Sequence, residues 1–234
     1  TNPSRYFPRL SSVLNGTLSS ATNWEAVSNV ARTMNFRVTV RDNNVDPTKQ
    51  QTQFGNQKIT VGNDGPFKVT STKVYNNIPG EFMWDVAGTS AAPYNVSNVK
   101  IDYTSDNGAT WNVLAASTAN DGNEVLDFSN VADNAQITVR VSAIDNVFYA
   151  VGKVTASTMV NCNGTAPTGL VANSITQTGA KIDWEPFANA TYNLKYKKAS
   201  DATWTEVNNL QTNTYTISGL TLSTAYNVSV VAVC

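Results

Sequence analysis

The chain contains no histidine, and this absence removes several kinds of chemistry at once. Ser-His-Asp and Cys-His nucleophilic catalysis, imidazole zinc ligands and the usual general base at neutral pH all depend on histidine. Paired carboxylates and calcium sites built from oxygen ligands do not depend on it. We therefore expect a chain that is not itself an enzyme and that holds no catalytic residues.

Charged residues and long apolar runs are also scarce. Charged side chains make up 14% of the 234 residues and the net charge is -1, whereas an average globular domain is about 25% charged. No basic stripe is present, so nucleic acid is not an expected partner, and no apolar run approaches the ~20 residues of a membrane span. Asn and Thr are abundant instead, and they favour polar turns and pleated strands. This composition is typical of secreted β-proteins.

Strand-like segments with alternating apolar and polar residues follow one another through residues 35–156. They are Asn35–Arg41, Lys58–Val61, Phe67–Ser71, Glu81–Val86, Val99–Thr104, Thr110–Leu114, Glu124–Phe128, Gln136–Ala143 and Tyr149–Ala156. Their spacing predicts an all-β fold with immunoglobulin-like sandwiches and argues against βαβ units. We expect residues 1–78 to form an irregular segment, with a short helical turn around Trp24–Val30, and strands that pack on the next domain. Residues 79–157 are expected to form an immunoglobulin-like β-sandwich.

A polar linker, Ser157–Pro167, leads into the last part of the chain. Five further segments there are spaced like strands B, C, C′, E and F of a β-sandwich, and this part resembles a fibronectin type III domain. Trp184 stands at the position of its core tryptophan, and Tyr226, six residues after Leu220, at that of the tyrosine corner. The resemblance implies a fibronectin type III-like domain over residues 158–234. A last strand would follow Val233; either the natural protein continues, or another chain supplies that edge.

Cys162 and Cys234 bracket this predicted domain. In a weakly charged, secreted-looking chain, two cysteines that flank one module predict a disulfide. Closing a loop of roughly seventy residues would stabilise the fold by about 4 kcal/mol in the chain-entropy model. A redox pair or a zinc site does not fit the spacing or the number of cysteines.

Thr104–Trp111 fits the Asp-box pattern of a hairpin. The Asp106 carboxylate is expected to accept turn N–H groups, Gly108 to adopt a left-handed conformation and Trp111 to pack underneath. Asp-boxes also recur in sialidases, but a propeller needs one in each blade and this chain has a single copy. The structural interpretation is therefore favoured, and Trp84, Trp111 and Trp184 are all expected to pack in the core.

Other residues are weaker candidates for binding. Asp42 and Asp46, and separately Asp121, lie in oxygen-rich turns that suit a structural calcium ion, although none follows the EF-hand spacing and turn chemistry alone explains them. No other cofactor is indicated. Trp204 is the tryptophan most suited to an exposed sugar-stacking position.

Scattered runs across nearly the whole chain carry a further resemblance. The runs are Phe36–Asn43, Gly65–Ser71, Trp84–Thr89, Val99–Trp111, Asn120–Gly122, Gln136–Ala143 and Asp145–Phe148. Their order resembles the region after the catalytic domain in secreted reprolysin-like zinc metallopeptidases of Bacteroidetes-type bacteria. The family's H-E-x-x-H zinc helix is absent, so no peptidase residue carries over.

The resemblance implies an accessory part of an extracellular peptidase. Protein substrate, a cell surface or the parent catalytic domain would be its partner, or it would serve as a spacer. The alternative is a carbohydrate-binding or adhesion module of another extracellular protein.

Overall fold

The computed structural model describes residues 5–19 and 25–234, and these residues are almost entirely strands and turns. The exceptions are the five-residue helix α1 (Leu10–Leu14) and a 3-10 turn, η1 (Pro47–Lys49). The chain divides into two compact units. One holds the chain up to Val74 together with Pro79–Ala156, and the other holds Tyr75–Ile78 with Ser157–Cys234. The all-β fold predicted from the sequence is confirmed.

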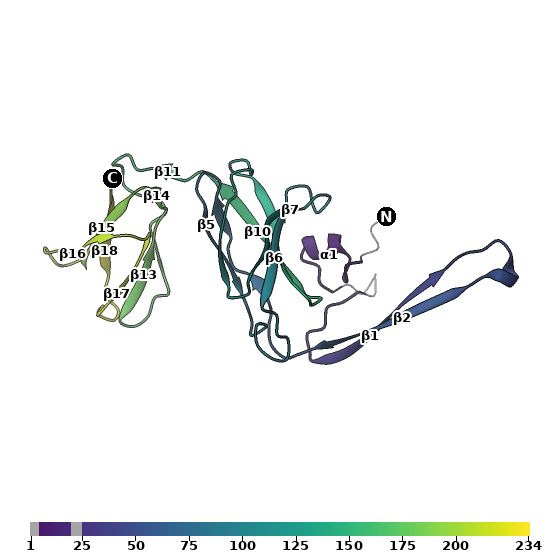
Figure 1. The fold of residues 1–234 in the computed structure, drawn as a ribbon. Coiled ribbons are helices and arrows are strands. Elements are labelled where there is room, and N and C mark those ends of the chain that lie inside the picture. Colours follow the sequence, from purple (N-terminus) through teal and green to yellow (C-terminus); the bar gives the residue numbers. More distant parts are fainter. Residues whose placement is uncertain (1–4, 20–24) are drawn as a thin grey trace. The chain divides into compact units, whose positions relative to one another are not determined.

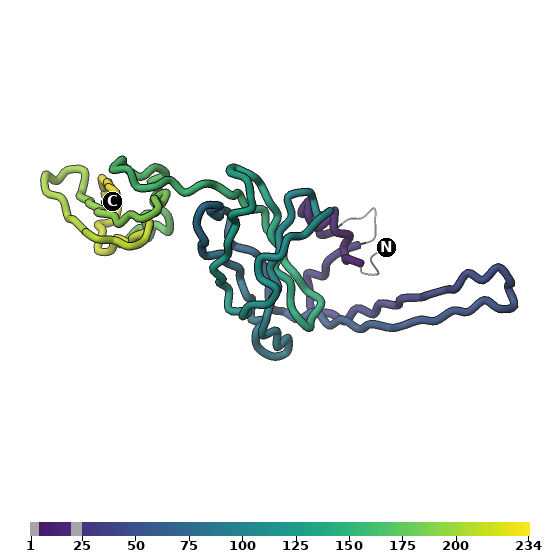
Figure 2. The backbone as a smooth tube through the Cα atoms, turned by 45° about the horizontal axis from the view of Figure 1, so that its top comes forward, coloured from purple at the N-terminus to yellow at the C-terminus, as the bar shows by residue number. Residues whose placement is uncertain are grey.

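A long antiparallel hairpin opens the first unit. Strands β1 (Arg32–Arg41) and β2 (Thr52–Val61) pair over ten residues each, from Arg32 opposite Val61 to Arg41 opposite Thr52. Figures 1 and 2 show the two running side by side, and they form a two-stranded sheet of their own. We shall call residues 32–61 the hairpin.

The rest of the first unit is a sandwich of a five-stranded sheet and a three-stranded sheet. The larger has the order β4-β10-β9-β6-β7 and the smaller β3-β5-β8. Their strands are β3 (Lys68–Val69), β4 (Lys73–Tyr75), β5 (Gly80–Asp85), β6 (Asn98–Thr104), β7 (Asn112–Ala119), β8 (Asn123–Leu126), β9 (Gln136–Ala143) and β10 (Tyr149–Ser157). Alternate residues of both sheets meet in one core, in which Phe82, Ile101 and Val139 are fully buried.

One buried amide joins the loops of this sandwich. The Asn120 side chain accepts the indole N–H of Trp84 at 3.1 Å and donates to the Thr89 hydroxyl at 3.0 Å and the Val96 carbonyl at 3.1 Å. Asn120 is almost fully buried, and it supplies the partner of the Trp84 indole N–H and of the Val96 carbonyl, as buried polar groups require. This residue therefore acts as a structural hub and not as part of a solvent-exposed turn.

The second unit has two three-stranded sheets, β12-β13-β17 and β16-β15-β18, and a short parallel pair, β11-β14. The strands are β11 (Val160–Asn161), β12 (Val171–Asn173), β13 (Gly179–Asp183), β14 (Phe187–Ala188), β15 (Thr191–Lys198), β16 (Thr205–Leu210), β17 (Thr214–Ser218) and β18 (Tyr226–Val233). Trp184 is buried with its ring edge-on to Tyr192. The Tyr226 hydroxyl accepts the Thr221 N–H at 3.0 Å, which is the contact of a tyrosine corner.

The structure departs from the sequence-based expectations in the N-terminal part. Trp24 lies outside the described residues, and Ala26 pairs with Ser19 in an isolated β-bridge where a helical turn was expected. The short helix lies earlier, at Leu10–Leu14. Residues 52–57, which lie outside the strand segments predicted from the sequence, belong to β2, because pairing with β1 outweighs the weak alternation of their side chains.

The role of Asn120 predicts the effect of its removal. Asn120→Ala should lower the free energy of unfolding of the first unit by about 2 kcal/mol, because it leaves the buried indole N–H of Trp84 and the Val96 carbonyl unpaired. Asn123→Ala is the matched control, since Asn123 is an exposed asparagine three residues further on, at the start of β8. It should change stability by less than about 0.5 kcal/mol. Urea unfolding followed by tryptophan fluorescence measures both, and equal effects would contradict the prediction.

Candidate interaction surfaces

A buried ion pair lies on the face of the large sheet that is turned away from the core. Arg140 of β9 donates from Nε and Nη2 to the two carboxylate oxygens of Asp102 on β6, at 2.8 and 2.7 Å. The Lys100 ammonium lies 3.1 Å from the same carboxylate, and Asp102 is completely buried. The third guanidinium nitrogen, Nη1, donates to the Tyr6 hydroxyl at 2.7 Å. Every polar group of this pair is thus satisfied, as a buried charge requires.

The N-terminal segment is held together by contacts of its own and packs against the neighbouring turn. Glu25 pairs with the Arg5 side chain and accepts the Arg9 backbone N–H, which lowers its pKa. A Cβ at Gly108 would meet side chains of Leu10 and Leu14 at about 3 Å, so α1 lies directly against the Asp-box hairpin. The pair and its cover are therefore structural groups and offer no open site.

Asp106 and Gly108 of the Asp-box have the predicted hydrogen bonds and backbone conformation. The Asp106 carboxylate accepts the Thr104 hydroxyl at 2.7 Å, the Thr110 hydroxyl at 2.6 Å and the Thr110 N–H at 2.9 Å. Gly108 has φ +86°, in the left-handed region. The hydroxyl and N–H of Thr110 lower the pKa of Asp106 to about 2. The carboxylate oxygens are engaged in hydrogen bonds within the turn, which supports a structural role for Asp106.

Trp111 differs from its predicted position. It is half-buried, precedes β7, and its ring carries the Arg140 guanidinium 3.7 Å from the ring centre. It therefore packs with the ion pair on the outer face of the sheet, whereas Trp84 and Trp184 are buried in the two cores. The sequence could not show this, because the segment that covers this face is about a hundred residues away in the chain.

The three aspartates proposed for calcium lie in turns of their own. Asp42 accepts the N–H groups of Asn44 and Gln51, and Asp46 accepts the N–H and hydroxyl of Thr48. Asp121, in another loop, accepts the Asn123 N–H. Among the described residues no group of three or more His, Cys, Asp and Glu is placed to hold a metal ion. The backbone donors that these carboxylates accept explain their positions without a metal.

The hairpin has one apolar and one polar face. Residues directly opposite each other in an antiparallel pair point to the same side, so the register assigns each residue to a face. The apolar face carries Met34, Phe36, Val38, Val40, Ile59 and Val61, together with Arg32, Gln53, Gly55 and Gln57. The polar face carries Thr33, Asn35, Arg37, Thr39, Arg41, Thr52, Phe54, Asn56, Lys58 and Thr60. Such an amphipathic strand pattern is typical of a face that is covered.

Only the base of the apolar face is covered by the described chain. Met34, Phe36 and Ile59 are half-buried, and the Phe36 ring meets Phe7 of the N-terminal segment edge-on at 5.2 Å. Further along the hairpin, Val38 and Val40 are each 65% exposed. The alternation thus continues past the part that the chain covers, and the distal half presents apolar side chains to solvent.

Trp204 lies in the second unit, in front of β16. It is half-buried, and the ammonium groups of Lys195 and Lys197 lie 5.0 and 5.2 Å from its ring centre. Next to Lys195 is a shallow hollow with hydrogen-bonding groups from Asn193, Glu206, Asn208 and Ser229. The two ammonium groups lie against the indole ring. Trp204 is therefore part of a basic polar surface, and its ring is less accessible for stacking on a sugar than an uncovered ring.

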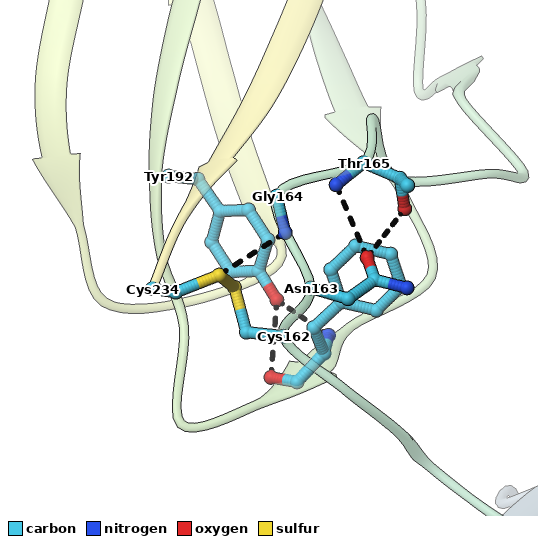
Figure 3. Close-up of a disulfide and its surroundings, with 7 residues drawn as sticks. Cys162, Asn163, Gly164, Thr165, Tyr192 and Cys234 are labelled. Atoms are coloured by element: carbon cyan, nitrogen blue, oxygen red, sulfur yellow. Dashed lines mark hydrogen bonds between the residues drawn. A yellow bond between two sulfur atoms is a disulfide. The ribbon is translucent and has the colours of Figure 1, made fainter.

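The predicted disulfide is present. Cys162 and Cys234 are bonded with their Cα atoms 5.4 Å apart and a sequence separation of 72. Figure 3 shows the bond beside Tyr192, with the Gly164 N–H donating to the Cys234 sulfur at 3.2 Å. Both cysteines are engaged, which leaves no thiol among the described residues for redox or metal chemistry.

Comparison with known proteins identifies the terminal module. The model of the fibronectin type III domain family matches residues 165–234. No curated protein sequence matches the chain. Similar solved structures include the chicken CNTN1 FN1-FN3 domains (14% identity, 78% of this chain and 70% of that chain, TM-score 0.31). Another is a two-domain fibronectin type III segment from chicken tenascin (15% identity, 73% and 90%, TM-score 0.26). TM-scores this low carry no argument about the remainder of the chain.

The described residues thus form sandwich-like sheets with a disulfide-bonded fibronectin type III domain at the C-terminal end. None of the helices in the described ranges has the length and apolarity for a transmembrane segment. Fibronectin type III domains generally mediate protein binding.

The lowered pKa of Asp106 predicts a pH dependence of stability. A carboxyl group whose folded-state pKa is depressed stabilises the fold above its unfolded pKa, near 4, and loses this effect as the pH falls through its folded pKa. Wild type should therefore be more stable than Asp106→Asn at pH 6, with the difference fading between pH of about 4 and 2. Urea unfolding at a series of pH values measures it. A difference that does not change with pH would contradict the prediction.

Proposed function

We propose that the chain is a non-catalytic accessory part of a secreted zinc metallopeptidase, and that it binds a folded protein through the hairpin. The sequence runs that resemble the region after the catalytic domain of such peptidases support the parent assignment. The disulfide in a fibronectin type III domain supports an extracellular location, because disulfides persist in oxidising compartments.

The observation that carries the binding role is the exposed distal half of the hairpin. Val38 and Val40 continue a face whose base is covered by the chain itself. A two-stranded ribbon exposed on both sides is marginally stable in water, so a surface that covers it would lower its free energy. The parent catalytic domain is the first candidate partner, and a protein substrate or a cell-surface protein is the second.

A truncated hairpin tests this role. Residues 38–55 are replaced by Asn-Gly, which joins Arg37 to Asn56, a directly opposed pair, through the shortest favoured hairpin turn. The half-buried base stays intact, so the first unit should keep its unfolding midpoint within a few degrees. We expect the parent catalytic domain, made as a separate chain, to bind wild type and to bind the truncated variant at least tenfold more weakly.

Two results would contradict the proposal. Equal affinity of wild type and the truncated variant would leave the chain with the role of a spacer. A coding sequence of the parent without an H-E-x-x-H zinc motif before this region would remove the peptidase assignment.

A second candidate function is carbohydrate binding by the fibronectin type III domain. The basic surface at Trp204 and the amide- and hydroxyl-lined hollow beside Lys195 favour it, because sugars bind by hydrogen bonds together with ring stacking. If it operates, a glycan array should give hits for wild type that Trp204→Ala loses and that Trp24→Ala retains. An array without hits would end this alternative.

A further inference from the structure

The sheet β16-β15-β18 of the second unit has a polar face on the side away from the core. Leu194 of β15 is buried in that core, so Lys195 and then Lys197 lie on the opposite side of the sheet. The register places Glu206 of β16 and Ser229 of β18 directly opposite Lys195, and opposed residues point to the same side. We call this side the outer face. Its polar and aromatic residues used below are Lys195, Lys197, Trp204, Glu206, Asn208 and Ser229, all exposed or half-buried.

Two ammonium groups of the outer face meet at one aromatic ring. Those of Lys195 and Lys197 lie 5.0 and 5.2 Å from the centre of the Trp204 ring, and the Lys197 ammonium also donates to the Asp201 carbonyl at 2.6 Å. Among the described residues neither lysine has an ion-pair partner. The ring therefore holds two like charges close together, and such charges repel. An anion that binds both ammonium groups would remove this repulsion.

The hollow beside Lys195 supplies hydrogen-bonding groups next to these cations. Glu206, Asn208 and Ser229 line it with a carboxylate, an amide and a hydroxyl, and Val231, which is 46% exposed, adds an apolar side chain. Glu206 is directly opposite Lys195, yet within the described part of the chain its carboxylate forms no ion pair and no hydrogen bond. The carboxylate can therefore accept hydrogen bonds from the hydroxyl groups of a ligand.

The charge of the outer face indicates which ligand fits. Two ammonium groups and the Glu206 carboxylate give a net charge of 2 − 1 = +1, which one negative group on a ligand balances. A polyanion with a charge on every unit would also meet Glu206, and like charges that face each other across an interface weaken binding. An acidic peptide side chain would pair with the lysines but brings no set of hydroxyl groups for the hollow. A sugar with a single carboxylate supplies both.

We propose that the outer face binds an acidic sugar, a monosaccharide unit of a glycan that carries one carboxylate. The carboxylate of the sugar bridges Lys195 and Lys197, and its hydroxyl groups pair with Glu206 and the other polar groups of the hollow. Trp204 is a positioning residue, because it holds the two ammonium groups in place. This inference rests on carbohydrate binding as the second candidate function and specifies the class of sugar and its contacts.

A glycan array with matched neutral probes tests the class of ligand. The complete 234-residue chain is applied to oligosaccharides that end in glucuronic acid or sialic acid, to the carboxamide form of each, and to heparin as a polyanion. We expect the best acidic probe to bind at least tenfold more tightly than its carboxamide. Equal binding of the two forms, or binding to heparin alone, would overturn the inference.

Variants then test the contacts with the best acidic probe and its carboxamide. Lys195→Gln and Lys197→Gln should each weaken binding of the acid at least fivefold and leave that of the carboxamide within twofold, because only the charge of the lysine is lost. Lys153→Gln, at an exposed lysine of β10 in the first unit, is the matched control and should change neither. Trp204→Ala should lose the preference for the acid, whereas Trp204→Phe should keep part of it, because phenylalanine still attracts cations. All lysine variants should keep the unfolding midpoint of wild type within a few degrees.

The failure of this inference differs from failure of the candidate function. If neutral glycans bind as well as acidic ones and Trp204→Ala abolishes both, the domain binds carbohydrate but this inference is wrong. The inference is also wrong if the lysine variants keep the full preference for the acid. If no glycan binds, both the inference and the carbohydrate-binding function are wrong.

Discussion

The buried ion pair of Arg140 and Asp102 holds the first unit together beyond its apolar core. Asp102 is fully buried and would be a large penalty without its partner. Because the remaining guanidinium nitrogen reaches Tyr6, the pair also ties the N-terminal segment to the sheet. Phe7, the next residue, contacts Phe36 at the base of the hairpin. The ion pair therefore supports, through two consecutive side chains, the part of the hairpin from which the exposed half extends.

The sequence predicted the strands well where alternation is regular and burial is local. Gln136–Ala143 has the predicted limits, because one face of this strand is apolar over its whole length. Alternation gives the wrong result for Asp102. This residue lies on the face of β6 opposite the apolar residues, where alternation predicts a side chain exposed to solvent. It is buried only because a segment nearly a hundred residues earlier folds over it, and alternation within a strand contains no information about that segment.

Sequence-based prediction was also limited where a side chain suits two different roles. Asn120 stands in an Asn-Asp-Gly turn and suggests turn or calcium chemistry, yet its amide is buried among Trp84, Thr89 and Val96. The sequence offers no signal for this, since an amide in a turn and an amide in a core differ only in what surrounds them. The disulfide was easier to predict, because only two cysteines exist and they flank one module.

The chain has a net charge near zero, but its basic and acidic residues are concentrated in different parts of the fold. The excess of basic residues lies in a two-stranded ribbon without a core, and the excess of acidic residues lies in the rest of the chain. Without a core, the distal ribbon depends on local interactions, namely cross-strand pairs, the Arg37–Phe54 contact and the tip turns. These contacts involve the polar face and the tip, and they leave the side chains of Val38 and Val40 exposed to solvent. A partner that covers these valines would therefore add the apolar contacts that a two-stranded ribbon lacks on its own.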